Sequence, residues 1–108
     1  MDNSTVISKR LLEARLASGL SQKKLGIEAG IDEFSASSRM NQYERGVHVP
    51  DFATVERLAS VLNVPTPYFY TRDNELAKLI VRYGQMNDTE KDKLRFLVSL
   101  TIKPDFRY

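Results

Sequence analysis

The sequence predicts an all-α protein, and three patterns support this fold class. Glycine, proline and asparagine recur at intervals of about 10 to 20 residues, which is typical of the breaks between short helices. Between these breaks the apolar residues follow helical spacing. No segment alternates apolar and polar residues as a half-buried strand does. The length of 108 residues fits one compact domain with a terminal extension.

The first predicted helix covers about residues 4–18 and ends before Gly19, a residue that suits a helix C-terminus. Its apolar face is broad and comprises Ile7, Leu11, Leu12, Ala14 and Leu16. Ser21 then provides an N-cap for a second helix over about 22–29, which Gly30 ends.

The third helix is expected within 34–45, with Met40 and Tyr43 as its apolar contacts. Asp51 caps a fourth helix, whose amphipathic pattern is the strongest in the chain. The apolar positions of that helix are Phe52, Val55, Leu58, Ala59 and Leu62. Two prolines follow and introduce a short helix through residues 68–70.

Two further helices are predicted over about 73–85 and 88–101, and Asn87 with Glu90 resembles a capping box for the second. One face of the first carries Leu76, Leu79, Ile80 and Tyr83. Apolar residues nearly encircle the second: Leu94, Phe96, Leu97, Val98, Leu100 and Ile102. Such a helix needs more than one partner surface, so we expect one side to pack on its own domain and the other on a second subunit. The expected dimerisation residues are Leu94, Phe96, Leu97 and Leu100.

The composition argues against several function classes. The absence of cysteine excludes disulfides, thiolate nucleophiles and cysteine-ligated metals. The only histidine, His48, belongs to no recognisable catalytic motif. No apolar run is long enough to span a membrane, and the first residues do not resemble a secretory signal. We therefore expect a cytoplasmic protein that is not an enzyme and uses no cofactor or metal.

The candidate functional residues lie on the second and third helices. The second opens with Ser21, Gln22, Lys23 and Lys24. The third carries Ser37, Ser38, Arg39, Asn41 and Gln42, and has no acidic residue between Phe34 and Tyr43. Amides, hydroxyls and guanidinium groups are the side chains that read base edges. Two short helices joined by a turn can place the second of them in a DNA major groove, which suggests double-stranded DNA as the partner.

These residues resemble the Cro/lambda-repressor-like (XRE-type) helix-turn-helix regulators. The matching positions span about residues 5–70 and are Arg15, Gly19, Leu20, Ser21, Gln22, Leu25, Ala29, Gly30, Ile31, Tyr43, Glu44, Arg45, Gly46, Pro50, Leu58, Ala59, Leu62, Val64 and the aromatic segment 68–70. The resemblance implies a five-helix lambda-repressor-like DNA-binding domain. It also implies that Gln22 contacts phosphate and braces the third helix, and that Arg39 and Arg45 contact the DNA backbone. By the same resemblance, Arg15 and Glu44 form a buried structural ion pair.

The chain departs from this family in two places. Thirteen residues separate Gly30 from Glu44, whereas family members have about nine. The extra residues, 32–35, form either a longer loop or an added turn on the third helix, and Asp32 with Glu33 should point away from DNA or cap that helix. The second departure is Gly26, where the family prefers alanine; glycine permits close helix contact but lowers helix propensity by about 1 kcal/mol.

We therefore expect residues 1–70 to form a helix-turn-helix DNA-binding domain and residues 71–108 to form a helical extension that makes a homodimer. The function expected is that of a sequence-specific transcriptional regulator, acting as a repressor. One alternative is an antitoxin-like or adaptor module whose C-terminal helices bind a partner protein. The other is a small enzyme, which would require a deep polar pocket. The operator sequence and any effector of residues 71–108 are left open by the sequence.

Overall fold

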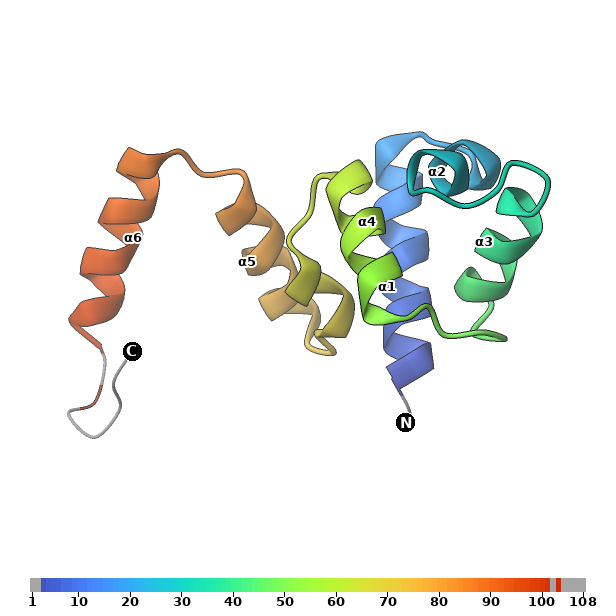
Figure 1. Ribbon diagram of the computed structural model, residues 1–108. Coiled ribbons are helices and arrows are strands. Elements are labelled where there is room, and N and C mark those ends of the chain that lie inside the picture. The colour runs from blue at the N-terminus through green and yellow to red at the C-terminus, as the bar shows by residue number, and fades with distance from the viewer. Residues whose placement is uncertain (1–2, 102, 104–108) are drawn as a thin grey trace.

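A computed structural model describes residues 3–101 and 103 of the chain. It contains six α-helices and one 3-10 helix, arranged as Figure 1 shows. Their bounds are α1 Asn3–Ser18, α2 Gln22–Glu28, α3 Ala36–Glu44, α4 Phe52–Leu62, η1 Thr66–Tyr70, α5 Asn74–Gly84 and α6 Asp88–Ser99. Among the described residues there is no β-strand, so the all-α prediction is confirmed.

The helix boundaries follow the predicted capping residues. The side chains of Ser21, Asp51 and Asn87 accept hydrogen bonds from backbone N–H groups in the first turns of α2, α4 and α6. The capping box of Asn87 with Glu90 is complete in both directions. The third helix covers residues 36–44, within the predicted range of 34–45, and the residues before it form a turn. The predicted helix at 68–70 is the 3-10 helix η1, which begins earlier, at Thr66.

The core lies where α1 to α4 and η1 meet. Its largest fully buried side chains come from all five elements and are Leu11, Leu25, Met40, Val55, Leu58 and Phe69. On α4, Val55 and Leu58 show the three-residue spacing predicted for its apolar face. The core therefore fixes α2 and α3 against α1 and α4, as a single packed unit.

Three residues of the apolar faces predicted for α1 and α4 are exposed. Leu12 and Leu16 of α1 are 38% and 64% exposed, and Phe52 at the start of α4 is 59% exposed. A helix packed on one side buries only a stripe about 100° wide. On α1 that stripe runs through Ile7, Leu11 and Ala14, and Leu12 and Leu16 lie outside it.

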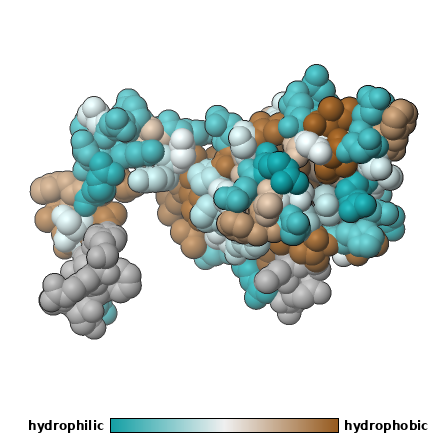
Figure 2. Space-filling view, viewed as in Figure 1, coloured by the Kyte–Doolittle hydropathy of each residue, from teal (hydrophilic) through white to brown (hydrophobic). Residues whose placement is uncertain are grey.

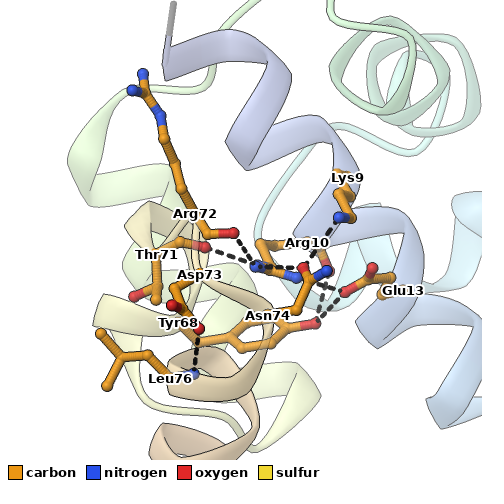
Figure 3. A network of polar contacts seen from close by, with 9 residues as sticks. All are labelled: Lys9, Arg10, Glu13, Tyr68, Thr71, Arg72, Asp73, Asn74 and Leu76. Carbon is orange, nitrogen blue, oxygen red and sulfur yellow. Dashed lines mark hydrogen bonds and ion pairs between the residues drawn. The ribbon is translucent and has the colours of Figure 1, made fainter. Parts of the chain in front are cut away.

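A polar network attaches α5 to α1 (Figure 3). Arg10 is only 2% exposed, and its guanidinium donates to the carbonyl oxygens of Thr71 and Arg72 and to Oδ1 of Asn74. It also donates to Glu13, whose carboxylate lies 3.2 Å from the Tyr68 hydroxyl. Thr71 and Arg72 lie just before Asp73, the N-cap of α5, so Arg10 fixes the start of α5 against α1.

Helix α6 projects away from the rest of the molecule (Figure 1). It has no buried residue, so the expectation that one of its sides packs on its own domain is wrong. Its contacts with α5 are at the surface: Arg82 lies 3.8 Å from Glu90, and the Lys91 ammonium lies over the Tyr83 ring. Because α6 meets α5 through these surface side chains and not through a packed apolar face, its own apolar residues stay uncovered.

Within the part of the chain that the structure describes, no helix has the length and apolar character needed to cross a lipid bilayer.

Candidate nucleic-acid interface

Helix α3 is held in place at its C-terminal end by a buried ion pair. Arg15 of α1 donates to both carboxylate oxygens of Glu44, with Nε–Oε2 at 2.5 Å and Nη2–Oε1 at 3.0 Å. The Glu44 side chain is only 5% exposed. The pKa of Arg15 is raised above its ordinary value, first by its hydrogen bond with Glu44 and in spite of its burial. Bidentate geometry fixes both the position and the orientation of the two groups.

Gln22 connects this ion pair to α2. Its Nε2 donates to Oε1 of Glu44 at 3.0 Å, while Arg15 Nη1 donates to the Leu20 carbonyl just before α2. The N-terminus of α2 and the C-terminus of α3 are therefore joined through one carboxylate. The bracing contact implied for Gln22 is present, and its side chain remains partly exposed.

Gly26 explains how closely α3 approaches α2. A Cβ atom at this position would lie 2.9 Å from the Ala36 Cβ and 3.0 Å from the Met40 Cγ, which is too short for a van der Waals contact. The glycine thus removes the atom that would separate the two helices. The unusual residue at this position is a packing requirement of this particular helix pair.

The outer face of α3 is polar. Ala36, Met40 and Tyr43 are buried and define the inner face. The predicted base-reading residues occupy the opposite side, with Ser37 and Ser38 exposed and Asn41 and Gln42 partly exposed. Positions spaced by three and four residues lie together on a helix, so these four side chains form one continuous surface. We call this surface, Ser37, Ser38, Asn41 and Gln42, the reading face.

Cations flank the reading face. Arg39 and Arg45 are exposed on α3 and at its C-terminal end, and Lys23 and Lys24 are exposed at the start of α2. Lys24 lies 3.6 Å from Glu28 and is therefore partly neutralised, whereas Lys23 takes part in no ion pair within the described residues. Of the two lysines, Lys23 is the better placed to meet an anionic partner.

The four extra residues before α3 form a turn that is closed by Asp32. Oδ2 of Asp32 accepts from the Phe34 backbone N–H at 3.0 Å, and its carbonyl accepts from the Ser35 N–H at 3.0 Å. The carboxylate that would repel phosphate is thus directed at the loop backbone. Glu33 is exposed. Of the two alternatives for this stretch, the structure shows the longer loop with a turn.

The sequence did not predict the burial of Arg10 or the exposure of Phe34. Arg10 lies three residues after Ile7 and four before Ala14, so its position on the buried stripe of α1 could have been read from the helical period. Phe34 is 89% exposed in the turn before α3. In the sequence, its position inside the extra segment 32–35 was its only distinguishing feature.

Among the described residues, no group of three or more histidine, cysteine, aspartate or glutamate side chains is close enough to hold a metal ion. The arrangement described above presents amides, hydroxyls and cations on a rigid helix. These groups can recognise a polar, anionic surface through hydrogen bonds and charge.

Comparison with known protein families identifies the unit formed by α1 to α4 and η1. The model of the family described as helix-turn-helix domain matches residues 7–67, which is more than half of the chain. The chain belongs to the helix-turn-helix domain family. The matched segment includes α2, α3 and both partners of the Arg15–Glu44 pair.

Among solved structures, the chain is similar to the crystal structure of the transcriptional regulator BswR. The two sequences are 46% identical, and the similarity covers 86% of this chain and 92% of that one, with a TM-score of 0.82. The similarity thus extends beyond the helix-turn-helix unit into the C-terminal helices. A search of curated proteins gave no match. Together the family and the similar structure support a DNA-binding transcriptional regulator.

Proposed function

We propose that this protein is an XRE-type transcriptional regulator that binds a specific double-stranded DNA sequence as a homodimer and represses by occupying its operator. Helix α3 enters the major groove and its reading face contacts base edges. Asparagine and glutamine pair well with adenine, and the serine hydroxyls bond to several bases. The protein acts in the cytoplasm, and catalysis plays no part in this mechanism.

The observation that carries this proposal is the rigid support of the reading face. Its four side chains sit on a helix whose inner face is buried and whose end is fixed by Arg15, Glu44 and Gln22. Base recognition requires side chains held in a defined position, since loose side chains lose entropy on binding. Arg39 and Arg45 occupy positions that the family resemblance assigns to contacts with the DNA backbone. Lys23 and Ser21, exposed at the start of α2, would contact phosphate there.

Dimerisation is supported by the apolar side chains that α5 and α6 leave uncovered. Leu76 and Leu79 of α5 are 50% and 65% exposed. Phe96 and Leu97 of α6 and Leu100, the residue just after it, are between 59% and 68% exposed, and Leu94 is partly buried. Figure 2 shows hydrophobic surface on α6 and on the side of α5 that faces it. An exposed apolar patch of this kind marks a protein interface.

Two copies would then place their α3 helices on half-sites about one helical turn apart, ~34 Å along the DNA. The experiment that tests this is selection of bound duplexes from a random pool at near-physiological salt. An inverted repeat with that spacing is the expected result. Enrichment of no sequence would contradict the proposal.

Two variants separate the parts of the proposal. Gln42→Ala should weaken binding to the selected operator by about 1–3 kcal/mol and leave non-specific binding unchanged. Leu97→Glu with Leu100→Glu should yield monomers in sedimentation, with an intact helix spectrum. Persistent dimers would mean that these residues are not the interface, and a protein that co-purifies with the chain would favour the adaptor alternative.

A further inference from the structure

The turn between α2 and α3 exposes an aromatic side chain that the proposed function does not use. Phe34 is the most exposed large apolar residue of the described chain, at 89%. It lies within residues 32–35, the segment that lengthens this connection. Exposing a whole aromatic ring to water is unfavourable, and burial of the ring in a complex would remove that cost.

The backbone that carries Phe34 is ordered by local hydrogen bonds. Its own N–H donates to the Asp32 carboxylate at 3.0 Å, and the next residue, Ser35, bonds to the Asp32 carbonyl at 3.0 Å. The Ser35 carbonyl in turn accepts from the Arg39 N–H at 2.8 Å, which attaches the turn to α3. The ring is thus presented by a defined turn, so little backbone entropy need be lost on binding.

The turn places Phe34 next to the N-terminal end of the reading face. Phe34 lies two residues before Ala36, the first residue of α3, and three residues before Ser37 of the reading face. Ser35, between Phe34 and the helix, has dihedral angles of φ −106° and ψ −12°, and its carbonyl is hydrogen-bonded to α3. The exposed ring is therefore carried by the segment that leads directly into the helix with the reading face.

The location also argues against a role of Phe34 in dimerisation. The loop between α2 and α3 and helix α6 lie at opposite ends of the molecule (Figure 1). The molecule is 52 Å long along its principal axis. A partner that meets both Phe34 and the reading face must contact the α3 side of the molecule, and under the proposed function that partner is DNA.

We propose that Phe34 reads a thymine in the half-site through contact with its C5-methyl group. This methyl is the apolar group that base pairs present in the major groove, and phenylalanine is among the side chains that contact it. The thymine lies at the edge of the half-site nearest the N-terminal end of α3. The inference rests on the proposed function and adds one base position to the sequence that the protein recognises.

The test removes the methyl group from the DNA and the ring from the protein. Each thymine of the selected operator is replaced in turn by deoxyuridine, which lacks only the C5-methyl. Binding is measured for the wild-type chain, Phe34→Ala and Phe34→Leu. At one thymine per half-site, the wild type should lose affinity about fourfold, as expected for one buried methyl-sized group. Phe34→Ala should bind both operators equally, and Phe34→Leu should keep part of the preference.

The outcomes are distinct. If Phe34→Ala keeps the wild-type preference for thymine over deoxyuridine, the inference is overturned while the proposed function stands. If Phe34→Ala binds both operators more weakly by the same factor, the ring contacts sugar or phosphate and the base-reading role is overturned. If the wild type selects no DNA sequence at all, the proposed function itself fails, and this inference with it. The melting temperature of Phe34→Ala should match the wild type, because the ring has few contacts in the free protein.

Discussion

Replacing Arg15 with alanine should destabilise the protein strongly, because it leaves a buried carboxylate without its cation. The substitution removes the hydrogen bonds to both Glu44 oxygens, at 2.5 and 3.0 Å, and the bond to the Leu20 carbonyl at 3.1 Å. The Glu44 side chain, 5% exposed, keeps only the neutral amide of Gln22 as a donor.

The expected magnitude follows from this loss. Breaking one side of a buried ion pair costs about 3–5 kcal/mol. The remaining Gln22 bond and the partial exposure of Arg15 favour the lower end, about 3 kcal/mol. In a domain of this size, 1 kcal/mol corresponds to about 4–8 °C, so the melting temperature should fall by more than ~10 °C.

The assay is thermal and urea unfolding followed by circular dichroism. Arg39→Ala is the matched control, since it removes an exposed arginine of α3 and should leave the melting temperature unchanged. A double variant with methionine in place of both Arg15 and Glu44 should recover most of the loss, because no charge is left unpaired. A melting temperature of Arg15→Ala within a degree or two of the wild type would refute this account of how α3 is fixed.

The packing of α2 on α3, the burial of Tyr68 and the exposed charge of Lys23 can each be tested by one substitution. Gly26→Ala should lower stability by about 1–3 kcal/mol in urea unfolding. Alanine favours helices more than glycine does, but its Cβ would lie 2.9 Å from the Ala36 Cβ, which is too close. Increased stability of this variant would contradict the close packing. Burial raises the pKa of Tyr68 from 10.0 to about 12, so its contribution to stability is complete below pH 10 and is lost as the pH rises toward 12. The variant Tyr68→Phe should show a smaller fall in stability over that range, and an identical fall would rule out this residue as a cause. Lys23→Ala should weaken binding to all duplexes by the same factor. It should also reduce the slope of log affinity against log salt concentration by about 1. An unchanged slope would mean that Lys23 contacts no phosphate.

Local sequence determined the helices of this protein. The caps at Ser21, Asp51 and Asn87 and the apolar spacing of α4 act within a few residues, so a sequence pattern is enough to identify them. The face of α3 could be predicted for the same reason, because a helical period assigns each residue to one side.

The family resemblance contributed what local patterns do not contain. Arg15 and Glu44 are far apart in the sequence, and no period connects them. Their pairing, and the bond from Gln22 to the same carboxylate, depend on how α1, α2 and α3 pack together. The remaining assignments to DNA contacts stay predictions until binding is measured.

Only the tertiary structure decided which apolar residues are covered. Leu12 and Leu16 satisfy a broad apolar pattern but lie outside the stripe that the neighbouring helices reach. Arg10 lies within that stripe and is buried, since backbone carbonyl oxygens before α5 satisfy its guanidinium. The exposure of Phe34 also depends on the path of the loop, which hydrogen bonds of Asp32 define. Burial is a property of how elements pack, and sequence periodicity identifies a face without specifying what covers it.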